Sequence, residues 1–203
     1  MHSVDYKIYA RIMGHGRGYA FSNKDFADIA PRGSIDVALS NLVATGKIRR
    51  IARGLYDYPR YKAEFGGILS PDMHQAALAV ARSAGVRIQS SGALAANMLG
   101  LSTQVPAQVV YLTDGRNKKI SIGKLNITFK HVPPVKLQKG GEITALVTNA
   151  IRHLGKNAID ELSAKALKKR FTDKDCRCLL KDARYVESWI YDEIRKIVSA
   201  GDK

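Results

Sequence analysis

The sequence predicts an α/β (α+β) protein, and three features of its 203 residues carry the prediction. The first third reads as short helices followed by a basic hairpin. The middle alternates apolar and polar residues, as strands do, and the last third repeats apolar residues at helical spacing. We place a first domain in residues 1–66 and a second in residues 67–203, with a small sheet in 85–133 and helices in 142–200.

The first domain is expected to contain three helices. One covers residues 4–13, and a second, short one begins after Ser22, which has Asp25 three residues later in the pattern of a capping box. A third helix follows, with Ser34 as its expected cap and Gly46 at its end. Its inward face is predicted from helical spacing to comprise Ile35, Ala38, Leu39 and Leu42.

Residues 47–56 predict a strand, a turn rich in positive charge and a return strand. This order of elements, helices and then a hairpin, is typical of a winged helix-turn-helix. In that fold one helix enters the DNA major groove and the hairpin follows the backbone. The outward face of the third helix is small and mostly uncharged. There Asn41 is suited to pair with adenine and Ser40 with several bases. A winged helix used only for protein contacts, with a solvated hairpin, is the alternative.

The residues expected to contact DNA lie on this helix, on the hairpin and around them. Cations would meet phosphates and release counterions, and the short helix residues would meet base edges. The full set is Arg17, Lys24, Arg32, Ser34, Asp36, Val37, Ser40, Asn41, Lys47, Arg49, Arg50, Arg53 and Tyr56.

The segments GRGYAFSNKDFADI and ALSNLVATGKIRRIARGLYDYP resemble the N-terminal domain of the AbiEi-like antitoxins. These belong to bacterial abortive-infection, or type IV, toxin–antitoxin systems. The resemblance covers about the first third of the chain, and its most specific parts are F-x-x-x-D-F and GKIRRIARGLYDYP. It implies a winged helix that binds inverted repeats in its own promoter and represses the operon. It also implies a cognate toxin with a nucleotidyltransferase fold, encoded next door and counteracted by this chain.

The second domain is expected to begin with a helix capped by Ser70, with Pro71 in its first turn. A strand, a helix capped by Ser90 or Ser91, another strand and an antiparallel hairpin follow. Three helices complete the chain; the last is expected to be the longest, starting after Thr172 with Asp175 in a second capping pattern. The expected ranges are 72–84, 86–89, 92–99, 108–113, 118–132, 142–154, 159–171 and 173–197.

The formal net charge of +15 predicts a polyanion or an acidic protein as partner. The excess is spread along the chain, at +5 in residues 1–66, +6 in 67–137 and +4 in 138–203. The second domain is therefore expected to share in DNA binding or to face an acidic protein. A basic cluster near the C-terminus is either a solvated face or a patch for DNA or toxin, and it comprises Lys165, Lys168, Lys169 and Arg170.

No catalytic site, metal or cofactor is expected, so we predict that the chain is not an enzyme. The five His are not at metal-ligand spacing, and Cys176 and Cys178 read as free thiols of a reducing cytoplasm. A nuclease needs clustered carboxylates around a metal, and residues 67–137 contain only Asp72 and Asp114. Neither a signal peptide nor a membrane span is evident, so a bacterial cytoplasmic location is expected.

A second function fits the same sequence. The chain could be a stand-alone winged-helix regulator whose second domain senses a ligand or forms oligomers. Gene order would distinguish the two hypotheses, because an adjacent nucleotidyltransferase-like gene favours the antitoxin function.

Overall fold

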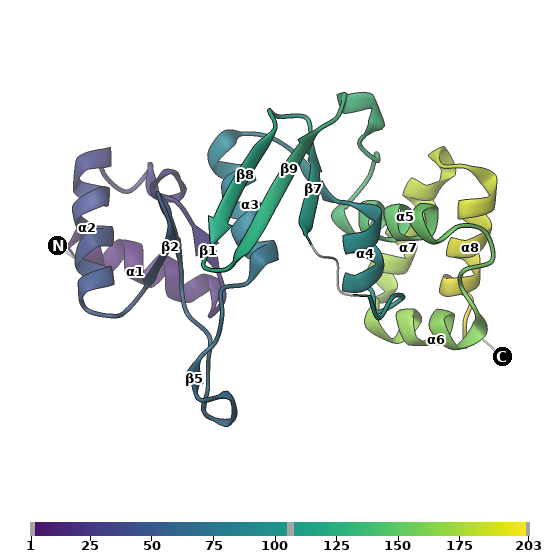
Figure 1. Ribbon diagram of the computed structural model, residues 1–203, viewed down its shortest axis with the longest axis horizontal. Helices are drawn as coiled ribbons and strands as arrows, with labels where there is room; N and C mark the ends of the chain where they lie inside the picture. The colour runs from purple at the N-terminus through teal and green to yellow at the C-terminus, as the bar shows by residue number, and fades with distance from the viewer. Residues whose placement is uncertain (1–2, 105–107, 202–203) are drawn as a thin grey trace. The chain divides into compact units, whose positions relative to one another are not determined.

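The protein divides into two compact units that both contain helices and strands (Figure 1). The computed structural model describes residues 3–104 and 108–201. The first unit holds the residues up to Arg87 together with Lys119–Ile127. The second holds Ile88–Lys118 and the residues from Thr128 onward. The predicted α/β class is confirmed.

The N-terminal part of the first unit packs helices against a three-stranded antiparallel sheet of order β1-β3-β2. Its elements in chain order are α1 (Val4–His15), β1 (Ala20–Phe21), the 3-10 helix η1 (Asn23–Phe26), α2 (Arg32–Ala44), β2 (Arg49–Ala52) and β3 (Leu55–Asp57). The apolar faces of α1 and α2 meet the aromatic residues of β1 and η1. This core buries Ile8, Ile12, Phe21, Phe26, Ile35, Ala38, Leu39, Leu42 and Ile48. The inward face predicted for the third helix is therefore confirmed.

The helix starts in this region confirm one prediction and correct another. The capping box is present: the Ser22 hydroxyl accepts from the Lys24 amide at 3.3 Å, and Asp25 accepts from the Ser22 amide at 2.8 Å. The cap expected at Ser34 is wrong, because α2 already begins at Arg32. Pro31 takes the cap position with a φ of −58°, so the helix begins three residues earlier than expected.

Helix α3 (Met73–Ala84) belongs to the first unit, which thus extends past residue 66, where we placed the domain boundary. Arg82 anchors this helix to the N-terminal sheet. Its guanidinium donates to the Asp25 carboxylate at 2.9 Å and to the Ala20 carbonyl at 2.7 Å. The helix also contacts β1 and β3, and its buried residues are Ala76, Ala77, Ala79, Val80 and Ala81.

The cap of α3 also differs from the expectation. Asp72, not Ser70, precedes the helix, and its carboxylate accepts from the amides of His74 and Gln75 at 3.0 and 3.1 Å. An aspartate cap adds a favourable charge to the positive end of the helix. A short hairpin precedes α3 and consists of β4 (Tyr61–Lys62), η2 (Ala63–Phe65) and β5 (Gly67–Ile68).

A four-stranded sheet of order β6-β7-β9-β8 forms the middle of the chain. Its strands are β6 (Ile88–Ser90), β7 (Val109–Thr113), β8 (Lys118–Ile122) and β9 (Leu125–His131). The strands expected from alternation are confirmed, with ends shifted by one or two residues. Alternate residues of β8 and β9 turn inward, so that Ile122, Ile127 and Phe129 are buried.

The second unit is completed by helices around a core of its own. They are α4 (Gly92–Met98), η3 (Pro134–Lys136), α5 (Glu142–Leu154), α6 (Glu161–Arg170), α7 (Asp173–Asp182), η4 (Ala183–Tyr185) and α8 (Ser188–Val198). Helices α4 and α5 approach closely because Gly92 has no side chain. A Cβ on Gly92 would lie 2.5 Å from the Cβ of His153.

The long last helix of the prediction is two helices in the structure. Its start is as expected, since Thr172 and Asp175 form a capping box. The chain then breaks between α7 and α8, where Val186 is extended with a φ of −100° and a ψ of 175°. Both helices pack against α5, and Leu179 of α7 and Ile190 of α8 are buried in the same core.

The two cysteines lie close together in α7 but differ in exposure. Cys176 is buried, Cys178 is exposed, and neither forms a disulfide. In the described parts of the chain, every helix is too short or too polar to cross a bilayer.

Candidate nucleic-acid interface

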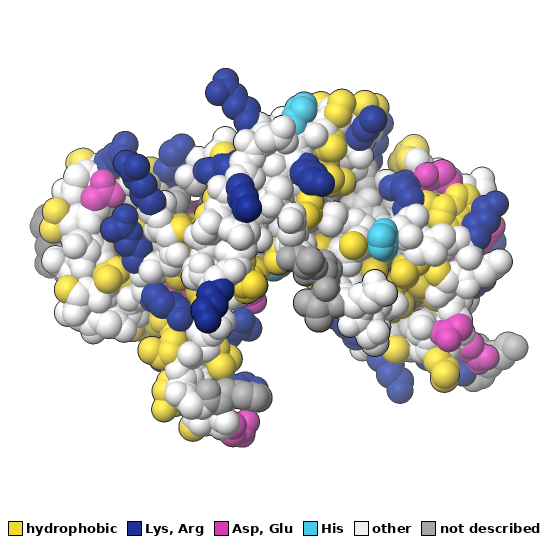
Figure 2. Space-filling model, in the orientation of Figure 1, with side chains coloured by type: hydrophobic (Ala, Val, Ile, Leu, Met, Phe, Trp, Pro, Cys, Tyr) yellow, Lys and Arg dark blue, Asp and Glu magenta, His cyan; other side chains and the backbone are white. Residues whose placement is uncertain are grey.

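Lys and Arg side chains are widespread on the surface, as the net charge requires (Figure 2). Helix α2 differs from this background because its outward face carries short side chains. Ser34, Val37, Ser40 and Asn41 are all exposed there, and Val37 is 61% exposed. The same helical period that buries Ile35 and its partners turns this row outward. Short side chains allow a helix backbone to approach a groove closely.

Two polar residues on this face already have partners. The Asn41 amide donates to the Asp5 carboxylate of α1 at 3.1 Å. Asp36 accepts from the Asn23 amide at 2.8 Å and lies 3.6 Å from the Arg32 guanidinium. A base contact by Asn41 would therefore have to replace or share the bond to Asp5.

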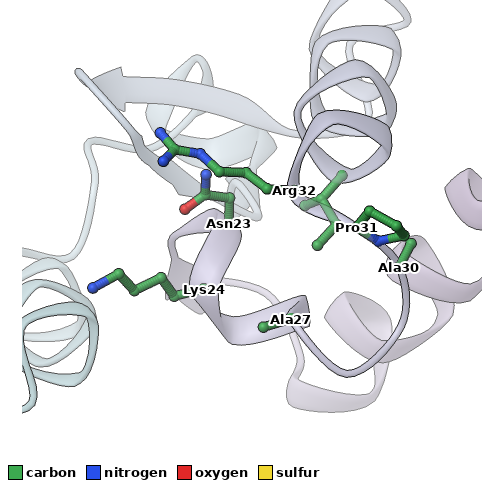
Figure 3. Close-up of a pocket in the computed structure, with 7 residues that line it drawn as sticks. Asn23, Lys24, Ala27, Ala30, Pro31 and Arg32 are labelled. Atoms are coloured by element: carbon green, nitrogen blue, oxygen red, sulfur yellow. The ribbon is translucent and has the colours of Figure 1, made fainter.

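A shallow hollow lies at the start of α2 (Figure 3). It has a volume of about 340 Å³ and is lined by Asn23, Lys24, Ala27, Ala30, Pro31, Arg32 and Ile35. In Figure 3, Arg32 and Asn23 reach toward the same side of the hollow, whereas Lys24 extends away from them. The Arg32 side chain is 86% exposed, and no side chain caps the first turn of α2. Unpaired first-turn amides favour an anion at this end of a helix.

The β2–β3 hairpin presents its arginines in two different ways. Arg50 and Arg53 are exposed, and a register shift between Arg50 and Ala52 bends the strand near them. Gly54 closes the turn with a φ of +69°, a conformation that favours glycine. Arg50 and Arg53 are therefore held on a short, twisted hairpin and are available to solvent.

Arg49 has a different role, although the sequence grouped it with its neighbours. It lies opposite Asp57 in the sheet, and its Nε and Nη2 donate to the two carboxylate oxygens at 3.0 and 2.6 Å. Its Nη1 donates to the Leu69 carbonyl at 3.1 Å. Asp57 is only 2% exposed. The side chain of Arg49 is thus committed to a buried ion pair that ties β2 to β3.

The remaining cations expected at the interface are held by local contacts. Arg17 stacks over Tyr58 at 4.7 Å and donates to the Pro59 carbonyl at 2.8 Å. Lys47 lies 5.1 Å from the ring centre of Tyr9, and Lys24 donates to the Ser83 carbonyl at 2.7 Å. Each contact positions the residue at the surface of the first unit.

Tyr56 is half-buried and packs in the core of the first unit. Its ring stacks on Phe21 with centroids 6.1 Å apart. The pKa of the Tyr9 hydroxyl is raised, mainly by its hydrogen bond with Tyr58 and secondly by burial. Because its ring packs on this core, we assign Tyr56 a role in supporting the hairpin and not a contact with DNA.

Some supporting residues were not identified from the sequence. Asp5 binds Asn41, which lies 36 residues further along the chain. Asn23 binds Asp36, which lies 13 residues further along. Separations of this size leave no local pattern in the sequence. Arg11 donates two hydrogen bonds of 2.7 Å to Asp28, which lower the pKa of that carboxyl. Arg11 is therefore paired within its own unit.

The basic cluster of α6 is largely used inside the second unit. Lys165 pairs with Glu161 at 2.6 Å, and the Lys168 ammonium lies 3.7 Å from the Cys176 sulfur. Arg170 donates to the carbonyls of Leu99 and Met98, at the C-terminal end of α4. Lys169 is exposed. This arrangement favours a role for the cluster in packing the helices together.

Metal-ligating side chains do not gather in the described residues, in which no group of three or more His, Cys, Asp or Glu could hold an ion.

The chain matches a family described as a family of unknown function, DUF6088, over residues 7–179. Because the match covers most of its length, the chain belongs to that family. A comparison with curated proteins found no match.

Proposed function

We propose that this member of the DUF6088 family is a DNA-binding repressor of the antitoxin type, with a winged helix-turn-helix in residues 1–66. The observation that carries the proposal is that one compact unit holds both the exposed, short-chained face of α2 and the exposed Arg50 and Arg53 of the β2–β3 hairpin. The element order, from α1 through the hairpin, and the pairing of β1 with β3 support it. A groove-reading helix needs such a face, and a wing needs such cations.

The proposed contacts follow from exposure. Arg50, Arg53 and Arg32 meet phosphates, which position the protein without reading sequence. Val37 and Ser40 face base edges, where an apolar side chain can contact a thymine methyl and a hydroxyl can pair with several bases. The buried Arg49–Asp57 pair keeps the hairpin rigid behind them.

The proposed partners are the promoter of the chain's own operon, bound at inverted repeats, and a neighbouring nucleotidyltransferase-like toxin. A single winged domain makes a small footprint, so two protomers on one operator fit the proposal. The toxin partner rests on the resemblance of the first third of the chain to the AbiEi-like antitoxins. We place the protein in the bacterial cytoplasm, where both partners are found, and propose that it acts by binding and not by catalysis.

Repression and toxin neutralisation are expected to respond separately to mutation. In cells that carry the neighbouring gene and a promoter reporter, the full-length Arg50→Gln/Arg53→Gln variant should lose repression but still restore growth. The wild-type chain should do both. Growth arrest that the wild-type chain does not relieve would contradict the antitoxin function, whereas an unrepressed reporter with the wild-type chain would contradict the repressor function.

A stand-alone regulator that senses a small ligand is the alternative function. An open hollow of about 420 Å³ in the second unit favours it and is lined by Asp114, Gly115, Arg116, Asn117 and His131. The His131 ring lies 2.8 Å from the Gly115 carbonyl, and its amide donates to Asn117 at 2.6 Å, so the lining is locally ordered. An isolated gene without a toxin-like neighbour would favour this alternative.

A further inference from the structure

The β8–β9 hairpin is strongly basic, and the proposed winged helix makes no use of it. Between Asp114 and Glu142 the sequence contains seven Lys and Arg and no acidic residue. Figure 2 shows Lys and Arg side chains standing out over β8 and β9. Those of the hairpin itself are Lys118, Lys119, Lys124 and Lys130, and all four are exposed.

The two faces of the hairpin differ in chemistry. One face buries Ile122, Ile127 and Phe129. Because side chains alternate along a strand, Lys119 and Lys130 lie on the other face. That face also carries small polar residues, and the Ser121 hydroxyl donates to the Asn126 amide oxygen across the strands at 2.6 Å. The outward face is therefore polar, cationic and braced by a cross-strand hydrogen bond.

The tip of the hairpin adds a further cation. Gly123 takes a φ of +57° in the turn, and the exposed Lys124 follows it. Residues 119–127 belong to the same compact unit as α2. Lys119 and Lys124 therefore lie in the compact unit that contains the proposed reading helix, whereas Lys118 and Lys130 belong to the second unit.

The chemistry of this face identifies its partner class. Protein interfaces depend on buried aromatic and aliphatic anchors, and the outward face of β8 and β9 has none between its lysines. Leu125, at the turn, is the exposed apolar residue of the hairpin, at 53%. Lysines separated by small hydroxyl and amide side chains match the regular negative charge of a nucleic-acid backbone. The backbone of a duplex offers no large apolar surface, so a polar, cationic face is sufficient to bind it.

We propose that the tip of the β8–β9 hairpin is a second DNA-backbone contact, in which Lys119 and Lys124, which belong to the same compact unit as α2, bind phosphates of the duplex that α2 reads. This inference rests on the proposed DNA-binding function. The hairpin carries no sequence reading of its own, because lysines on phosphates fix position and affinity. It extends the bound duplex beyond the footprint of the winged helix.

The test compares two full-length variants with equal charge loss. One is Lys119→Gln/Lys124→Gln; the control is Lys156→Gln/Lys174→Gln, in which both lysines are exposed in the second unit. Fluorescence anisotropy measures Kd for a duplex from the region upstream of the gene at several salt concentrations. Circular dichroism melts of both variants establish that they fold like the wild type.

The hairpin variant is expected to bind roughly tenfold more weakly, and its salt slope should fall by about 0.9 for each lysine that contacts a phosphate. The control should keep the wild-type slope. A hairpin variant that matches the control overturns the inference while the proposed function stands. A wild-type chain that binds no duplex overturns both. Unchanged DNA binding together with lost toxin neutralisation assigns the hairpin to an acidic protein and also overturns the inference.

Discussion

Replacing Arg50 and Arg53 by glutamine is expected to weaken binding to the upstream duplex by roughly a hundredfold. Both side chains are exposed on the β2–β3 hairpin and, in the proposed complex, neutralise phosphates. Losing two phosphate contacts lowers the salt slope by about 1.8. The helix α2 is then held less firmly in the groove, so base contacts weaken as well. Anisotropy titrations with the upstream duplex and with a shuffled duplex of equal composition measure both effects.

The matched control removes two arginines of the second unit. Arg177 and Arg184 are exposed in the second unit, and the Arg177→Gln/Arg184→Gln variant has the same net charge as the test variant. It should retain the wild-type slope and the preference for the upstream sequence. Equal losses in the two variants would mean that the effect comes from net charge, and the wing would have no specific part in binding.

The Asp57→Ala variant is expected to lose about 3 kcal/mol of folding free energy. Asp57 is 2% exposed and receives two hydrogen bonds from Arg49, so its removal leaves a half-buried guanidinium without its carboxylate. For a unit of this size, that loss corresponds to a fall in Tm of roughly 10–20 °C. Circular dichroism follows the unfolding of both units together, so the transition of the first unit is the part of the melt that the fluorescence of the second unit does not share. The single Trp189 reports separately on the second unit, whose transition should not move.

Asp28→Ala is the control for that prediction. Asp28 also binds an arginine through two short hydrogen bonds, but its side chain is 66% exposed. Exposed ion pairs contribute little to the free energy of unfolding, so this variant should change Tm only slightly. If Asp28→Ala destabilised the chain as much as Asp57→Ala, burial of the Arg49 pair could not be the cause.

Local patterns in the sequence were sufficient for much of the fold. The spacing of Ile35, Ala38, Leu39 and Leu42 gave the buried face of α2 because helical period depends only on neighbours along the chain. The capping boxes at Ser22 and Thr172 are equally local. What depends on such short-range geometry can be read without a structure.

Contacts between distant residues could not be predicted in this way. Arg49 and Asp57 form a pair because of strand register, whereas composition groups Arg49 with Arg50 as one basic run. Helix α3 joins the first unit through Arg82, which contacts residues about 60 positions earlier. The break between α7 and α8 was missed because the apolar stripe continues through the turn with helical spacing.

The proposal as a whole depends on α2 reading bases while the hairpin holds it on the backbone. The most direct test is a titration of the wild-type chain with its upstream duplex and with the shuffled duplex at about 0.15 M salt, where specific complexes exceed non-specific ones by roughly a thousandfold or more. We predict a much tighter complex with the upstream duplex and a steep loss of affinity as salt rises. Equal, weak binding to both duplexes would contradict the account.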